Sequence, residues 1–210
     1  MKIAKEGIWF IVLALGLAVG AYLVHWMVGV LFSLVSLFVI NFFRDPERQA
    51  PIDSSLMVTG ADGRILKIEQ LTSSPYFNEP HQRISIFMSP FNVHVNRVPM
   101  DGTVEKIEYH PGKFFNASLD KASQHNERNA VWLKGLDGAR VAFVQIAGFI
   151  ARRIVCYAKV GDEYKKGERY GMIRFGSRME LYFPNDWKVL VGVGDKVYAG
   201  RTPLAKMGLS

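Results

Sequence analysis

Hydrophobic residues divide the chain into two parts, and the first is a long apolar run. From Ile8 to Ile40 no residue carries a formal charge, and His25 is the only ionisable residue. One straight helix over this run would be about 50 Å long, well beyond the ~30 Å core of a bilayer. We therefore predict two helices, Ile8 to about Val24 and about Met27 to Phe43, that turn near His25 and Trp26. One tilted span is the alternative, and it would place the two ends of the run on opposite sides of a membrane.

Basic residues flank the apolar run on both sides. Lys2 and Lys5 precede it, and Arg44 and Arg48 follow it. A hairpin would leave all four on the cytoplasmic side, as the positive-inside tendency prefers. The run is far longer than the apolar region of a signal peptide. We expect residues 1–43 to anchor the protein in the cell membrane and the remainder to lie on the cytoplasmic side.

After Arg48 the pattern changes to short β-branched runs separated by glycine-bearing turns, which is typical of an all-β domain. We expect residues 44–210 to form this domain, and we predict a loop over the polar segment Asn116 to Asn129. The predicted strands are Leu56–Thr59, Arg64–Glu69, Arg83–Met88, Gly102–Tyr109, Ala130–Leu133, Arg140–Ile146, Ile154–Ala158, Gly171–Phe175, Met179–Phe183 and Lys196–Ala199.

Two internal repeats are visible in this domain. Residues Asp62–Glu69 match Asp101–Glu108, and Val160–Gly167 match Val193–Gly200. Each repeat joins a tight turn to a strand, which indicates duplicated hairpins. The second pair resembles the turns of biotinyl/lipoyl-type domains. The expected fold is therefore mainly β, a barrel-sandwich-like domain with repeated hairpins, preceded by an α-helical membrane hairpin.

The chain is basic, with a formal net charge of +7 and a pI of about 9.5. A basic surface beside a membrane suits anionic phospholipid headgroups. Nucleic acid is not expected as a partner, because the chain has no dense Lys/Arg run and no recognisable binding motif. The single cysteine, Cys156, lies in an apolar run and is expected to be a small buried hydrophobe. No Cys/His spacing suggests a metal site.

The dipeptide Gly176-Ser177 lies between two strand-like runs, Tyr170–Phe175 and Met179–Phe183. A serine hydroxyl can attack the carbonyl of the preceding residue through a five-membered ring. Glycine leaves that carbonyl unhindered, and strain at such a turn would favour rearrangement. Taken alone, Gly-Ser is a common turn sequence.

Asp62 precedes Gly63 at a turn, where an aspartate commonly caps the backbone. Asp101 occupies the same place in the other repeat and provides an internal control. His94 lies in the proline-bracketed segment Ser89–Pro99, where a hydrogen-bonded core histidine is the more frequent role. The histidines in polar surroundings are expected at the surface: His81, His110 and His125.

Taken in order, these elements closely resemble the short, bacterial- and archaeal-type phosphatidylserine decarboxylase proenzymes. The resemblance covers essentially the whole chain. The matching segments are Phe42–Arg48, Ala61–Gly63, Ser89–His94, Pro111–Phe114, Asn126–Arg128, Gln145–Gly148, Ala151–Ile154 and Arg174–Arg178.

The resemblance implies self-cleavage between Gly176 and Ser177 into a β chain, 1–176, and an α chain, 177–210, that stay associated. Ser177 would become a covalent pyruvoyl group, with no metal and no PLP. Its carbonyl would condense with the amine of phosphatidylserine and act as an electron sink during decarboxylation to phosphatidylethanolamine. A homo-oligomer is also expected.

Processing in the family uses an Asp-His-Ser arrangement, onto which Asp62 and Ser177 map. Longer members carry two histidines three positions apart; here His94 occupies the first place and Arg97 the second. Either His94 serves both processing and decarboxylation, or Arg97 supplies only charge. A guanidinium cannot act as a base at neutral pH, so His94 is the candidate.

Two other functions compete with this one. A membrane-anchored adaptor with a lipoyl-like barrel would explain the apolar run and the repeated turns, but the chain has no lysine between two methionines at a hairpin tip. A pyruvoyl decarboxylase of a soluble amino acid is disfavoured by the membrane segment.

Overall fold

The computed structural model describes residues 2–117, 125–149, 153–174 and 176–208. The chain forms two compact units, Met1–Glu47 and Arg48–Ser210, which are described separately. The predicted end of the membrane segment, Phe43, lies four residues before this boundary.

The N-terminal unit is a pair of helices, α1 Ile8–Val24 and α2 Trp26–Phe42. A short turn, η1 Lys5–Gly7, precedes α1, and β1 Lys2–Ile3 pairs with β2 Arg44–Asp45 at the open end of the hairpin.

The helices separate at His25, as predicted. His25 has an extended backbone, and its Nδ1 accepts the Met27 N–H at 3.2 Å, which caps α2. Trp26 is the first residue of α2, not part of the turn. The segment Lys5–Val24 is long and apolar enough to cross a membrane, whereas α2 is apolar but shorter. A Cβ atom at Gly29 would lie 2.4 Å from the Tyr22 ring, so glycine is required for this close approach between the helices.

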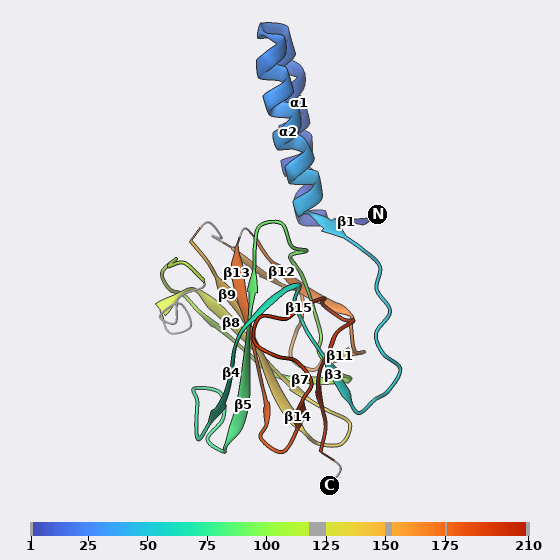
Figure 1. Cartoon of the computed structure of the whole chain (residues 1–210), viewed down its shortest axis with the longest axis vertical. Coiled ribbons are helices and arrows are strands. Elements are labelled where there is room, and N and C mark those ends of the chain that lie inside the picture. The colour runs from blue at the N-terminus through green and yellow to red at the C-terminus, as the bar shows by residue number, and fades with distance from the viewer. Residues whose placement is uncertain (1, 118–124, 150–152, 175, 209–210) are drawn as a thin grey trace. The chain divides into compact units, whose positions relative to one another are not determined.

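The C-terminal unit is mainly β, which confirms the predicted fold class. Its principal sheet has eight antiparallel strands and curls around the core (Figure 1). In sheet order the strands are β11 Glu163–Tyr164, β7 Gly102–His110, β8 Arg128–Lys134, β9 Arg140–Ala147, β13 Ser177–Pro184, β5 His81–Met88, β4 Gly63–Leu71 and β15 Lys196–Val197. Two three-stranded sheets complete the unit: β10 Ile154–Cys156, β12 Arg169–Ile173 and β6 Val95–Arg97; and β14 Lys188–Val189, β16 Pro203–Lys206 and β3 Leu56–Val58.

The two halves of this unit repeat each other, as the sequence repeats predict. Strand β4 pairs with β15 in one half, and β7 pairs with β11 in the other. Gly63 lies opposite Val197, and Gly102 lies opposite Tyr164, which is the matching position of the other repeat. The aspartates match as well, because Asp62 accepts the Ala199 N–H and Asp101 accepts the Lys166 N–H, at 2.8 and 2.7 Å. Strands β3–β5 with β13–β16 therefore form one half, and β6–β12 form the other.

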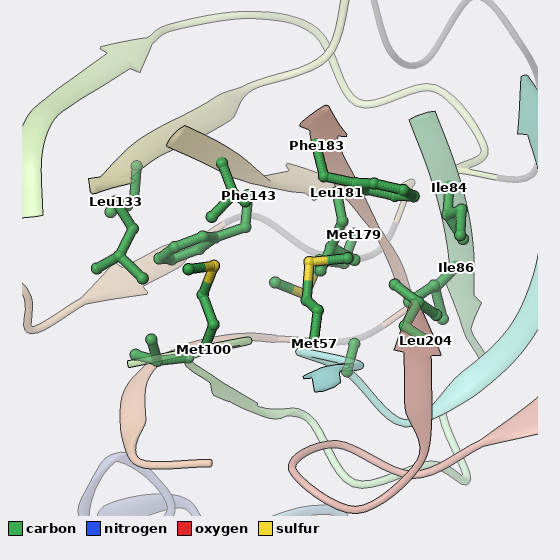
Figure 2. Packing of buried hydrophobic residues seen from close by; sticks show 14 of the residues in the cluster. Met57, Ile84, Ile86, Met100, Leu133, Phe143, Met179, Leu181, Phe183 and Leu204 are labelled. Carbon is green, nitrogen blue, oxygen red and sulfur yellow. The ribbon is translucent and has the colours of Figure 1, made fainter. Parts of the chain in front are cut away.

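The core lies between the concave face of the large sheet and the smaller sheets. Figure 2 shows Met57 and Leu204 packing with side chains of the large sheet, including Phe143 and Met179. Because side chains alternate along a strand, Met179, Leu181 and Phe183 face this core. The other face of β13 is buried too, beneath Tyr76.

Six short strands among the described residues were not predicted, β1, β2, β6, β11, β14 and β16, because runs of two to four residues carry no periodicity. The predicted loop extends too far, since Arg128 and Asn129 belong to β8. Residues 118–124 of that loop, and Phe175, lie outside the described residues. Cys156 is only half-buried, so it is not the fully buried hydrophobe expected.

The turn glycines give a stability prediction. Gly200 has φ +72°, and a Cβ atom there would lie 2.9 Å from the Arg97 side chain; Gly138 has φ +85° and open space. In both alanine variants the Cβ atom makes the left-handed backbone conformation less stable by about 1–2 kcal/mol. Gly200→Ala should lose more stability than Gly138→Ala, because Arg97 must also move. Denaturant unfolding of the two variants measures the difference, and equal losses would contradict this packing.

Candidate functional site

Ser177 is the first residue of β13, the strand between β5 and β9 at the middle of the large sheet. It lies opposite Met88 on one side and Ala147 on the other. Its side chain is fully buried, and its Oγ donates to the Met88 Sδ at 3.3 Å. A thioether is a weak acceptor, so it holds the hydroxyl without competing strongly for its proton.

Gly176 places its carbonyl in a tight slot. Its φ of +66° is left-handed, a conformation that glycine adopts without penalty. A Cβ atom at Gly148 would lie 2.1 Å from the Gly176 carbonyl oxygen, so only glycine at position 148 leaves room for that oxygen. Gly148 and Gly176 thus both determine the position of one carbonyl group, that of the peptide bond to the Ser177 nitrogen.

His94 joins this site through its ring. The side chain is fully buried, its Nδ1 lies 3.0 Å from the Asn92 carbonyl oxygen, and its Nε2 accepts the Gly176 N–H at 3.4 Å. A carbonyl oxygen can only accept, so the proton is assigned to Nδ1 and the lone pair to Nε2. Asn92 is fixed in turn, because its Oδ1 accepts both the N–H and the hydroxyl of Ser89. The Nε2 lone pair of the imidazole therefore faces the peptide next to the serine, where it accepts the Gly176 N–H.

Asp62 is buried at the same end of the sheet but is bound by other partners. The two terminal nitrogens of Arg48, Nη1 and Nη2, donate to the Asp62 carboxylate. The Ala199 N–H donates to Asp62 Oδ1 at 2.8 Å. The described contacts thus bring His94 to Gly176, the residue before Ser177, and tie Asp62 to Arg48. The Nδ1 of the imidazole contacts the Asn92 carbonyl oxygen, whereas the Asp62 carboxylate binds Arg48 and the Ala199 N–H.

Arg97, in the place of the second family histidine, is also buried. Its guanidinium donates to the Gly167 carbonyl at 2.8 Å. Asp101, the control residue, accepts from the backbone of Lys166 and pairs with Lys165. His81 corrects a prediction: it is buried rather than at the surface, with its ring between Phe77 and Tyr182.

Sequence reasoning missed a row of buried amides behind the site. The Asn96 Nδ2 contacts Met88 Sδ at 3.8 Å, the Gln145 Nε2 donates to Asn96 Oδ1 at 2.9 Å, and the Asn129 Nδ2 donates to Gln145 Oε1 at 3.3 Å. Asn96 and Gln145 are fully buried. The available signal was an amide side chain inside an otherwise apolar strand, since buried polar groups must find partners.

A second buried network of polar side chains lies on the outer face of β13 and is centred on Glu180. The Glu180 carboxylate accepts from Ser85 at 3.1 Å and from the Tyr182 hydroxyl at 2.7 Å, and pairs with Arg178 at 3.4 Å. Burial and the adjacent Glu180 charge raise the pKa of Tyr182 well above its usual value, so the phenol stays a donor. The strand that begins at Ser177 is therefore fixed by backbone pairing on both edges and by side chains on both faces.

Comparison with known proteins agrees with these features. Residues 35–205 match the family described as Phosphatidylserine decarboxylase. A "Phosphatidylserine decarboxylase proenzyme" of Syntrophus aciditrophicus is 49% identical over 205 residues, which cover 96% of each chain. Proteins of the same name from Oleidesulfovibrio alaskensis and Burkholderia cenocepacia are 51% and 47% identical, covering 91% and 98% of this chain and 88% and 96% of the relatives.

The Asp62–Arg48 pair yields a prediction about stability. Its side chains are only 5% and 8% exposed. Removing one partner of a buried ion pair costs about 3–5 kcal/mol, because the other charge is left uncompensated. Asp62→Asn should therefore destabilise the unit by about that amount in denaturant unfolding. Asp101→Asn should change stability by at most about 1 kcal/mol, since Asp101 is 37% exposed and its Lys165 partner is solvated. Similar losses of unfolding free energy in the two variants would show that the buried charge of Arg48 is not stabilised by Asp62.

Proposed function

Because the chain belongs to the phosphatidylserine decarboxylase family, we propose that it makes its own prosthetic group by cutting the Gly176–Ser177 peptide bond. The protein is a proenzyme of a carboxy-lyase that converts phosphatidylserine to phosphatidylethanolamine in phospholipid synthesis. The observation that most directly supports cleavage at this bond is the convergence of the Ser177 hydroxyl, the Gly176 carbonyl and the His94 Nε2.

The proposed cleavage is an N-to-O acyl shift followed by elimination and loss of ammonia. The Ser177 Oγ attacks the Gly176 carbonyl carbon and the C–N bond breaks, which gives an ester and a free amine at residue 177. Loss of the Cα proton then expels the carboxylate of Gly176, leaving dehydroalanine at residue 177. Water replaces the nitrogen, and ammonia leaves. The products are a β chain, 1–176, and an α chain, 177–210, with a pyruvoyl group at its start.

His94 is the proposed base for the first step. Its lone pair at Nε2 lies 3.4 Å from the Gly176 nitrogen, one residue from the reacting hydroxyl. Rotation about the Ser177 Cα–Cβ bond moves the Oγ from the Met88 sulfur toward the carbonyl. In this proposal Asp62 acts indirectly: it fixes Arg48 and the Ala199 backbone at this end of the sheet.

The surroundings of Ser177 fit a pyruvoyl group. Its carbonyl supplies an electrophile for the substrate amine and an acceptor for the electrons that remain when carbon dioxide leaves. Of the described residues, Met88 excludes water on one side, and Asn96 presents an amide N–H against the same sulfur. Gln145 fixes Asn96, so this donor stays oriented toward the Met88 sulfur, which also contacts Ser177.

The α chain remains bound after cleavage because its first strand is central. β13 pairs over its length with β5, and it carries Met179, Leu181 and Phe183 into the core. The helices of residues 1–43 are the proposed membrane anchor, and the domain from residue 44 is the proposed cytoplasmic, catalytic part. The whole-chain match supports an enzyme over the lipoyl-like adaptor.

Self-cleavage gives a direct test. Wild type should separate on a denaturing gel into fragments that meet at Gly176/Ser177, and the small fragment should have the mass of a pyruvoyl-blocked 177–210. Ser177→Ala should stay full-length and inactive on phosphatidylserine, because the nucleophile is gone. Ser85→Ala is the matched control, since Ser85 is equally buried but bonds Glu180. An active wild type of full-length mass would rule the mechanism out.

The role of His94 is tested by rate. General-base help is worth about 10²–10⁴-fold, so His94→Ala should slow the appearance of fragments by a factor in that range. His81→Ala removes another buried histidine at the far end of β5 and should cleave at the wild-type rate. Arg97→Ala should also cleave. If His94→Ala keeps the wild-type rate while Arg97→Ala does not cleave, the base has been misassigned.

A further inference from the structure

A cavity of about 560 Å³ opens beside the proposed reaction site. Ser89, Asn92, Arg64 and Lys196 line it, together with the aromatic ring of Tyr198. Among the residues that line it, none is acidic. The cavity therefore presents two cations with no acidic residue in its lining, although one nitrogen of Arg64 donates to the Gly194 carbonyl and the Ser89 hydroxyl donates to Asn92 Oδ1.

The two cations face each other directly. Lys196 on β15 lies opposite Arg64 on β4 in the antiparallel register. Like charges in this position destabilise a sheet. The corresponding pair in the other half of the fold is Glu163 opposite Thr103, which carries no such repulsion. None of the ion pairs among the described residues involves Arg64 or Lys196, so the repulsion is not relieved within the described chain.

The cavity is connected to the reaction site through two of its lining residues. The Asn92 carbonyl accepts from the ring of His94, and Ser89 follows Met88, whose sulfur contacts the Ser177 hydroxyl. In phosphatidylserine only a few atoms separate the amine from the phosphorus. Met88 and Ser177 face the core, whereas Arg64 and Lys196 lie on the other face of the sheet, so a headgroup whose amine is at residue 177 would reach the cavity around the end of the sheet at Ser89.

The approach to this end of the unit is lined by aromatic side chains. In the described part of residues 48–208, the exposed large aromatics are Phe91, Tyr109, Phe149 and Tyr198. By strand register and loop position all four lie toward the end of the sheet where Ser177 sits, whereas the exposed Leu136 is in the turn at the opposite end. Aromatic rings are favoured at the lipid–water interface.

We propose that this cavity binds the phosphodiester of a membrane phospholipid, with Arg64 and Lys196 holding the phosphate between them. The choice of phosphatidylserine as the natural ligand rests on the proposed function. The cavity itself is present in the uncleaved chain, so its affinity for a phosphodiester can be measured without any decarboxylation.

The binding experiment uses full-length, uncleaved Ser177→Ala protein in detergent micelles. Its ligands are dihexanoyl phosphatidylethanolamine, dihexanoylglycerol without phosphate, and inorganic phosphate. Adding Arg64→Gln or Lys196→Gln should weaken binding of the phospholipid by about ten-fold or more, since a charged hydrogen bond is lost. Binding of dihexanoylglycerol should not change. Lys188→Gln is the matched control, because Lys188 faces Lys206 across β14 and β16 but lies outside this cavity.

Stability without ligand separates binding from a structural role. Lys196→Gln should leave the unfolding free energy unchanged or raise it, because a like-charge contact is removed. Lower stability, or phospholipid affinity equal to that of Lys188→Gln, would overturn the proposal. Competition by inorganic phosphate as strong as that of the phospholipid would also overturn the lipid assignment.

Activity provides the link to the reaction. In the Ser177-containing chain, Lys196→Gln should cleave itself normally and show a KM for phosphatidylserine raised about ten-fold with kcat little changed. Wild type that binds the phosphodiester but does not decarboxylate phosphatidylserine would contradict the proposed function alone. If the wild-type protein is active and both Lys196→Gln and Arg64→Gln have an unchanged KM for phosphatidylserine, this inference alone is contradicted.

Discussion

The central position of β13 is the constraint on which the rest of the structure depends. A peptide bond can be cut inside a folded domain only if both new ends stay in place. Here the strand after the bond is paired with β5 and β9, inserts Met179 and Leu181 into the core, and fixes Glu180 within a buried network on the other face. The chain before the bond is a short connection from β12. The proposed cleavage after Gly176 would therefore break a connection and leave the sheet intact.

The duplicated architecture bears on where the proposed cleavage site lies. In one half of the fold β8 and β9 are joined by a tight hairpin turn through Gly138, with φ +85°. In the other half β5 and β13 pair in the equivalent way, yet they are far apart in sequence, and Gly176 with φ +66° leads into β13 from a different direction. The same backbone position is thus a closed hairpin in one half and an entering chain in the other. That difference gives room for Met88, His94 and Gly148 to gather around one peptide bond.

Local patterns in the sequence predict the parts of this protein that depend on neighbours along the chain. The apolar run interrupted by His25 predicts the helical hairpin, and the matching Asp-Gly segments predict the duplicated β4 and β7. Pairings between distant segments carry no such signal. Nothing local indicates that Arg48 binds Asp62, that the Asn92 carbonyl accepts a hydrogen bond from His94, or that His81 is buried beside aromatic rings. The resemblance supplied the residues of the site, whereas their contacts became visible only in the folded chain.

The use of one histidine for two proposed steps follows from how its ring is held. The Nδ1 of His94 is committed to the Asn92 carbonyl, so Nε2 is the nitrogen left for proton transfer. Before cleavage that nitrogen contacts the Gly176 N–H, which belongs to the segment that becomes a chain end. Cutting after Gly176 releases this segment from its covalent link to β13, whereas the ring remains fixed by Asn92 and Ser89. In the proposed mechanism the ring would thereby keep its position while the Gly176 end of the chain is released. Arg97, in the place of the second family histidine, supports the turn at Gly167 instead.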